Sequence, residues 1–138
     1  MRKLLEYIKI GSLNIKLLEQ ININLITTEV ILTIERLEHV EDRRKQVYEN
    51  VKDILPTAIY EPDYIYRDWN NRENTLIFIK DINESSKISI IIKIAQFNDE
   101  KHTKNSIITM IKIGKKTFNK IYKNKSKNLL YQKLDKIV

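Results

Sequence analysis

Residues 105–113 read Asn-Ser-Ile-Ile-Thr-Met-Ile-Lys-Ile, and we interpret the rest of the chain from this stretch outward. Its β-branched residues suit a pleated, half-buried surface, so the stretch predicts a β-strand. It also carries hydroxyl groups at Ser106 and Thr109 and an amine at Lys112. Polar side chains on such a strand are most often solvated on one wet face. They are also groups that can act on a phosphate.

Two more strand candidates, residues 75–80 and 87–94, come just before this stretch. The links between the three candidates are residues 81–86, rich in turn formers, and the longer polar segment 95–105. Consecutive strands with hairpin-length links predict an antiparallel meander. Alternation within the second strand places Ser89, Ile91 and Lys93 on one side of the sheet.

The amino-terminal part predicts shorter elements. Residues 4–10 fit a short strand or a helical turn that ends at Gly11, and Ser12 is expected to cap a short helix. Residues 29–32 fit an extended piece. Thr33 is expected to cap the next helix, which has the acidic residue Glu35 in its first turn.

A helical period runs from residue 34 to residue 55, because apolar residues recur at spacings of three, four and seven. The charged block 41–45 predicts either one helix or two with a break near Arg44. Pro56 ends the pattern, because proline disfavours helical geometry in the residue before it. His39 and Arg43 are four residues apart and therefore share one face of this helix.

In the middle of the chain, the turn at residues 62–63 predicts a strand directly after it. Near the carboxyl terminus, residues 115–136 predict a basic helix or coil. Phe118, Ile121 and Tyr122 are its expected docking residues, and residues 129–131 fit an edge strand. Helices come first and a sheet second, which is an α+β layout in a single domain over residues 1–138.

Composition limits the chemistry. The chain has no cysteine, so a disulfide framework, a thiolate metal site and a thiol nucleophile are all excluded. No run approaches the roughly 20 apolar residues that a membrane span needs, and no signal-peptide pattern opens the chain. We expect a soluble protein used in the cytoplasm, made there or delivered into a target cell.

Charge is concentrated at one end. The net charge is +7, and residues 112–138 hold nine lysines against the single acid Asp135. Such a cluster attracts polyanions, of which nucleic acid is the commonest. Two other readings stay open, namely lysine enrichment from an AT-rich coding sequence and a basic domain that contacts proteins.

Several chemistries have no motif here: there is no glycine-rich phosphate loop, GxSxG elbow or HExxH pair. The two histidines, His39 and His102, would need carboxylates to hold a metal. The remaining set of His, Arg, Lys, Ser and Thr suits RNA cleavage, in which the ribose 2′-hydroxyl is the nucleophile and the protein supplies proton transfer and cations.

Six segments together resemble the phage-associated nuclease domains grouped with barnase, EndoU, the tRNA-cutting colicins and RelE. The likeness spans residues 11–133, in the segments 37–43, 62–65, the strand ending at Lys80, 92–94, 105–109 and 129–133. The resemblance implies a metal-independent endoribonuclease without a cofactor, typically a toxin acting on tRNA or other RNA. It implies helices packed on a four- to five-stranded antiparallel sheet, and an immunity or antitoxin protein as a partner.

By position, His39 and Arg43 match the family's helix residues, Lys93 its strand lysine, and Ser106 and Thr109 its paired hydroxyls. Our hypothesis gives His39 proton transfer, gives Arg43 and Lys93 stabilisation of the charged phosphate, and gives the hydroxyls contact with its oxygens. The residues expected to hold RNA are Lys80, Lys112, Lys115 and Lys116.

Two features complicate this hypothesis. Relatives of this kind usually follow the arginine with a second histidine and a proline, whereas Arg43 is followed by Arg44 and Lys45. The alternative function is therefore an inactive RNA- or protein-binding phage component. In addition, Ser106 and Thr109 would face opposite sides of a regular strand, so either a bulge separates them or Ser106 belongs to the preceding loop.

Overall fold

The computed structural model describes residues 6–39, 42–97 and 104–136, and within residues 37–45 it describes no side chains. His102, one of the two histidines, therefore lies outside the described residues. No helix in the described part is long and apolar enough to cross a membrane.

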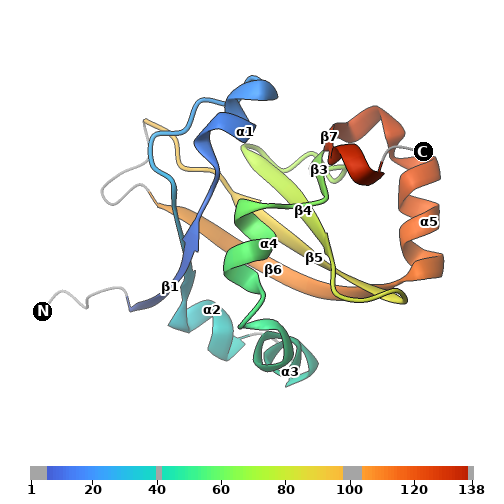
Figure 1. Ribbon diagram of the computed structural model, residues 1–138. Helices are drawn as coiled ribbons and strands as arrows, with labels where there is room; N and C mark the ends of the chain where they lie inside the picture. Colours follow the sequence, from blue (N-terminus) through green and yellow to red (C-terminus); the bar gives the residue numbers. More distant parts are fainter. Residues whose placement is uncertain (1–5, 40–41, 98–103, 137–138) are drawn as a thin grey trace, which may run out of the picture.

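A seven-stranded sheet forms the centre of the molecule, in the order β1-β2-β6-β5-β4-β3-β7 (Figure 1). Neighbouring strands are antiparallel except β2 and β6, which are parallel. The strands are β1 Tyr7–Ser12, β2 Glu29–Thr33, β3 Tyr64–Arg67, β4 Thr75–Asp81, β5 Ser86–Lys93, β6 Asn105–Gly114 and β7 Leu129–Gln132.

The expected sheet of four to five antiparallel strands was therefore wrong in size and in one pairing. The three central strands end within one residue of their predicted limits, because their alternation and turns are local signals. The extra strands come from short segments whose partners are distant in sequence. β1 precedes α1, β2 lies between α1 and α2, and α5 follows β6, so the expected order of helices first and sheet second was wrong.

Five α-helices and two 3₁₀ turns complete the described part of the fold. They are α1 Ile15–Gln20, α2 Ile34–His39, α3 Asp42–Val51, α4 Leu55–Tyr60, α5 Lys115–Asn124, η1 Ser126–Asn128 and η2 Leu134–Lys136. The long helical period is thus divided among α2, α3 and α4, rather than forming one helix or two with a break near Arg44.

The first face of the sheet is covered by α1, α3 and α4. Leu18 of α1, Val51 of α3 and Ile59 of α4 pack with Phe78 and Ile90 of the central strands. This cluster is the main core of the protein. Its extent explains why the amino-terminal half contributes so many short helices, since each one covers part of the same apolar surface.

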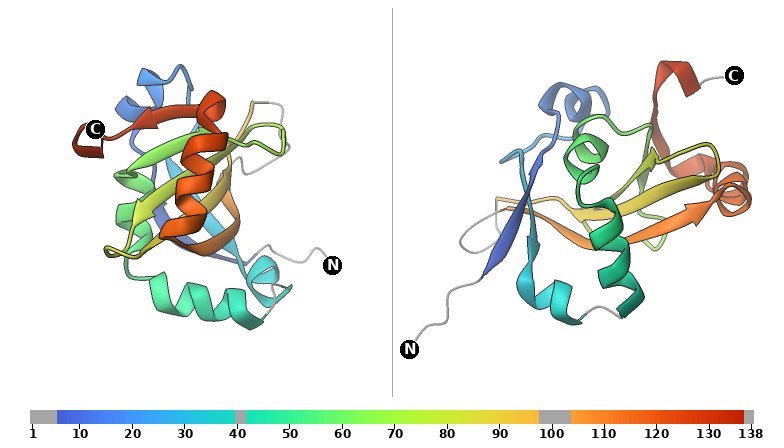
Figure 2. Two further views of the ribbon diagram at one scale, coloured as in Figure 1. Left: turned by 90° about the vertical axis from the view of Figure 1, so that its right-hand side faces the viewer. Right: turned by 60° about the horizontal axis from the view of Figure 1, so that its bottom comes forward.

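In the described part of the chain, α5 covers one part of the second face of the sheet. Phe118 of α5 packs with Tyr64, Ile79 and Ile113, and Figure 2 shows α5 lying across the sheet on this side. Ile111, on the same face of β6, is 42% exposed. Among residues 6–39, 42–97 and 104–136, the second face therefore has a covered end, under α5, and an end that these residues leave open.

Helix starts show which capping predictions hold. Thr33 caps α2 as expected, because Arg36 N–H donates to Thr33 Oγ1 at 3.1 Å, and Glu35 lies in the first turn. The Ser12 cap was wrong: Asn14 caps α1, with its Oδ1 accepting from Leu17 N–H at 3.2 Å. β1 runs through Gly11 to Ser12, which leaves Ser12 in a strand.

Pro56 was expected to end a helix, and it instead stands at the start of α4. α3 has already ended at Val51, so the helix does stop before the proline. Proline is tolerated in a first helical turn, because the N–H that it lacks would have no partner within the helix there. A new helix can therefore start at Leu55, and the spacing of buried apolar residues continues past Pro56 in Ala58 and Ile59.

Candidate functional site

A β-bulge in β6 brings Ser106 and Thr109 to the same face of the sheet. Ser106 is paired with Lys93 and Thr109 with Ile91, while the register shifts between Ile91 and Ile92. Because Ile107 still pairs with Ile92, Ile108 is the extra residue. Lys93 and Ile91 are two residues apart and share a face, so Ser106 and Thr109 share it too. Of the two alternatives, the bulge is correct, and Ser106 belongs to the strand.

Asn105, the first residue of the same motif, fixes where β6 begins. It is fully buried, and its Nδ2 donates to Thr27 O at 2.8 Å and to Glu29 O at 3.0 Å. Its Oδ1 accepts from Ala95 N–H at 2.9 Å. One amide thus ties the start of β6 to the segment entering β2 and to the end of β5. It holds Ser106 and Lys93 in register.

Arg36 of α2 contacts the bulge from the neighbouring helix. Its Nη1 donates to Ile108 O at 3.1 Å, which satisfies a carbonyl of the irregular residue. Arg36 also lines a cavity of about 410 Å³ together with Thr33, Glu35 and Ser106. Sequence reasoning missed Arg36, although its position three residues before His39 on one helix was a usable signal.

The hydroxyl of Thr109 makes no hydrogen bond within the described structure. Its Oγ1 is buried and finds no hydrogen-bond partner among the described residues, as is also true of the Tyr66 hydroxyl. A buried polar group without a partner costs roughly 1–3 kcal/mol, so such groups are uncommon in folded proteins. Lys93, by contrast, is exposed on the same face.

His39 and Arg43 can be placed only by their backbone. His39 is the last residue of α2 and follows Arg36 by three residues, which is about 4.5 Å along the axis and the same side of the helix. Arg43 lies in α3, which packs through Val47 and Val51 on the first face of the sheet. Both side chains fall outside the described residues.

Lys80 and Lys112 lie on the first face, opposite Ser106 and Thr109, since each pairs with Ile88 of the main core. Lys80 Nζ donates to Glu61 O at 2.8 Å and lies 3.6 Å from Asp63 Oδ1, with its side chain 15% exposed. The charge of Lys80 is therefore already matched within the fold, whereas Lys112 is exposed.

Lys115 and Lys116 begin α5, on the second face, and both are exposed. Lys116, Lys120 and Lys123 follow spacings of four and three, so they form one stripe along the outer side of the helix. Within residues 6–39, 42–97 and 104–136, no carboxylate pairs with these lysines. We call Lys116, Lys120 and Lys123 the α5 stripe.

Asp81 shows how other lysines at this end are neutralised. It is paired with Lys87, whose ammonium lies 4.5 Å from the centre of the Phe118 ring, and with Lys136 at 2.6 Å. Burial opposes ionisation of Asp81, but hydrogen bonds from Lys136 and Lys87 outweigh it and lower its pKa. These contacts fix α5 on the sheet and leave the α5 stripe outside.

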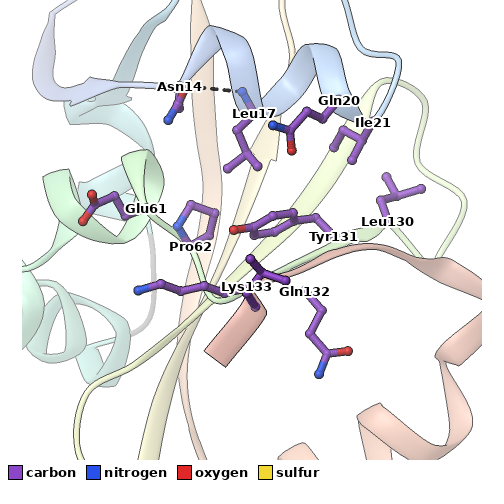
Figure 3. A pocket seen from close by; sticks show the side chains of 11 residues that line it. Asn14, Leu17, Gln20, Ile21, Glu61, Pro62, Leu130, Tyr131, Gln132 and Lys133 are labelled. Carbon is purple, nitrogen blue, oxygen red and sulfur yellow. Dashed lines mark hydrogen bonds between the residues drawn. The ribbon is translucent and has the colours of Figure 1, made fainter. Parts of the chain in front are cut away.

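A larger cavity, of about 740 Å³, lies between α1 and β7 at the far edge of the sheet (Figure 3). Figure 3 shows the Tyr131 ring between Leu17 and Pro62, with Gln20 and Lys133 nearby. Burial raises the pKa of Tyr131. None of the predicted site residues lines this cavity, and three strands lie between β6 and β7 in the sheet order.

The described side chains contain no group of three or more His, Cys, Asp or Glu that would suit a metal ion. What the structure does bring together is a lysine, an arginine and two hydroxyls around a strand bulge, on the open end of the second face. Cations and hydroxyls are groups that form strong hydrogen bonds with an anionic ligand such as a phosphodiester.

Comparison with protein families identifies which proteins share this arrangement. The family described as phage-Barnase-EndoU-ColicinE5/D-RelE like nuclease2 (PBECR2) matches residues 14–132. The chain belongs to this nuclease family, which confirms the resemblance expected over residues 11–133. Comparison with curated proteins and comparison with solved structures each gave no match.

Proposed function

We propose that this nuclease is a metal-independent endoribonuclease that cuts RNA by attack of a ribose 2′-oxygen on the adjacent phosphorus. A bond forms from the 2′-oxygen to phosphorus and the bond from phosphorus to the 5′-oxygen breaks. The products are a 2′,3′-cyclic phosphate and a free 5′-hydroxyl. The observation that carries the proposal is the bulge at Ile108, which sets two hydroxyls beside Lys93 on an open sheet surface.

Each nearby group has a task in this reaction. The phosphorane-like transition state gains negative charge on its non-bridging oxygens, and Lys93 is placed to stabilise it. Ser106 is partly exposed and can donate to one of these oxygens. The Thr109 hydroxyl is unpartnered but buried, so its donation to another requires the bound RNA to displace the side chains that cover it. Arg36 adds a second cation, and it lines a cavity together with Ser106.

Proton transfer is the task proposed for His39. The attacking 2′-hydroxyl must lose a proton and the leaving 5′-oxygen must gain one, and imidazole serves both steps near neutral pH. Position 39 lies one helical turn from Arg36, which supports this assignment. Arg43, in α3, is the further cation expected from the resemblance.

Binding of the RNA chain is assigned to lysines of α5, beside the second face, and to Lys112, on the first face. Lys115, Lys116 and the remainder of the α5 stripe face solvent beside the covered end, and Lys112 is exposed at the end of β6. Such contacts bind phosphates without reading sequence. A toxin role in the cytoplasm, with tRNA or other RNA as substrate and an immunity or antitoxin protein as partner, extends the proposal.

The test is cleavage of a total tRNA pool by purified protein, with and without EDTA, followed by analysis of the new ends. The proposal expects cyclic phosphate ends in both conditions. Loss of cutting on chelation would contradict metal independence, and a His39→Ala protein as fast as wild type would remove the role of the histidine.

A second candidate function is RNA binding without cleavage. It is favoured by the presence of Arg44 and Lys45 after Arg43, where the resemblance implies a second histidine and a proline. It predicts tight, salt-dependent RNA binding with no new cyclic phosphate ends. The end analysis above distinguishes the two candidates.

A further inference from the structure

We propose that the loop from Asp68 to Asn74, which carries Trp69, is a binding site for one unpaired nucleobase beside the bond that is cut. The inference rests on the proposed function and deepens it, because it assigns base recognition to a part of the chain that the phosphate-binding groups do not include. It also makes Trp69 a determinant of substrate specificity.

The loop is held in one shape by a buried carboxylate. The Asp68 side chain is fully buried; its Oδ2 accepts from Arg72 Nε at 2.5 Å and its Oδ1 accepts from Asn70 N–H at 3.0 Å. Asn71 and Asn74 adopt left-handed backbone angles, with φ of 59° and 56°, which asparagine tolerates better than most residues. The loop is therefore preorganised for a ligand.

Trp69 has one supported side and one free side. Its ring meets the Tyr66 ring edge-on, with centroids 5.6 Å apart and planes at 78°, and it packs against the apolar cluster of the second face. The residue is nevertheless partly exposed. A rigidly backed aromatic ring with an open surface is the usual platform on which single-stranded nucleic acids stack their bases.

The loop adjoins the proposed cleavage site through the backbone. Asp68 N–H donates to Thr75 O at 3.3 Å, and Thr75 pairs with Lys93 in the adjacent strand. Ile94 N–H, next to Lys93, donates to Asn74 O at 2.7 Å. Two strand spacings of about 4.8 Å place the backbone of Asp68 about 10 Å from that of Lys93. A nucleotide whose phosphate contacts Lys93 can reach the loop with its base.

The charge of the loop favours a base over a phosphate. The charge of Arg72 is matched by Asp68, Glu73 adds a negative charge, and Asn70 and Asn71 are neutral and exposed. A phosphate would meet no free cation among these side chains. Amide groups, however, match the donor and acceptor edges of a base. The ligand that fits is thus a base, stacked on Trp69 and bonded at its edge.

The experiment uses the fact that Trp69 is the single tryptophan of the chain, so its fluorescence reports the loop alone. Short 2′-O-methyl RNA, which has no free 2′-hydroxyl to attack, is titrated into the full chain. Binding is followed by fluorophore anisotropy and by tryptophan emission. We expect the emission to change and to saturate at the same oligonucleotide concentration as the anisotropy.

Variants complete the test. Trp69→Ala should weaken binding by roughly tenfold or more, and Trp69→Phe should recover part of that loss, because a stacked base contributes about 1–3 kcal/mol. Tyr60→Ala is the matched control, since Tyr60 is an exposed aromatic at the end of α4, on the first face. Circular dichroism shows whether each variant folds.

Two failures are distinguishable. If RNA binds and is cut while tryptophan emission stays constant and Trp69→Ala binds as tightly as wild type, the base site is wrong and the nuclease proposal stands. If no RNA is bound or cut, the proposed function falls and the base site falls with it.

Discussion

Lys93 and Ser106 are directly opposite each other in the antiparallel pair of β5 and β6, at the open end of the second face. Opposed residues in such a pair have Cβ atoms about 4.5–5.5 Å apart, so their side chains can bind the same small group. The bulge then adds Thr109 to the same face, one step further along. A regular strand would have turned Thr109 into the main core.

Replacing Lys93 by alanine should lower the rate of RNA cleavage by about 100- to 1,000-fold at saturating substrate, the usual loss when one transition-state donor is removed. Stability should change little, because Lys93 is exposed. Single-turnover cleavage of labelled RNA measures the effect. Lys16→Ala, an exposed lysine on α1, is the control and should cut as fast as wild type.

Thr109→Val separates function from stability. The change keeps the shape of the side chain and removes a buried hydroxyl that has no partner in the described structure. Urea denaturation should therefore show equal or greater stability, by up to about 1 kcal/mol, while cleavage falls. A variant that loses stability and retains full cleavage would show that the hydroxyl serves the fold.

Arg36→Ala should reduce cleavage with little loss of stability, since the Arg36 side chain is exposed and its bond to Ile108 O lies at the surface. Arg36→Lys keeps the charge and loses the forked geometry, so it should recover cleavage only in part. Measuring kcat and KM separately decides the role. A change in KM alone would mean that Arg36 binds RNA without acting in the transition state.

Local signals in the sequence predicted the three central strands, the Thr33 cap and the place of Phe118. The seven-stranded sheet was not predictable in the same way, because the parallel pair of β2 and β6 depends on contacts such as that of Asn105 with Glu29, 76 residues away. Arg36 was missed for a related reason. Its spacing of three residues from His39 was a signal, but its partner is a backbone carbonyl freed by a bulge, which side-chain patterns do not reveal.

The pH dependence of stability should show the Asp68 ion pair. Burial opposes ionisation of Asp68, but hydrogen bonds from Arg72 and Asn70 outweigh it and lower its pKa. A lowered native pKa means that the stabilisation is complete above the unfolded value near 3.9 and is lost as pH falls through the native value.

Asp68→Asn should therefore cost about 2 kcal/mol at neutral pH and leave a flatter dependence below about pH 4. Thermal unfolding from pH 2 to pH 7 measures both quantities. Asp53→Asn, at an exposed carboxylate in the segment between α3 and α4, is the control. Parallel curves for Asp68→Asn and wild type at acid pH would exclude this ion pair as a source of the pH dependence.

The α5 stripe should control how RNA binding responds to salt. Each lysine that contacts a phosphate of single-stranded RNA releases counterions, which contributes about −0.7 to the slope of log affinity against log salt. Changing Lys116, Lys120 and Lys123 together to alanine should make this slope shallower by about 2 and weaken binding of all sequences alike. The three side chains are exposed and unpaired within the described residues, so folding should be unaffected.

Cleavage at saturating RNA should stay near the wild-type rate, because the α5 stripe lies over the covered end of the second face, away from Lys93. An unchanged slope would place the RNA path elsewhere, and an equal loss of cleavage at saturation would mean that α5 helps to form the cleavage site itself.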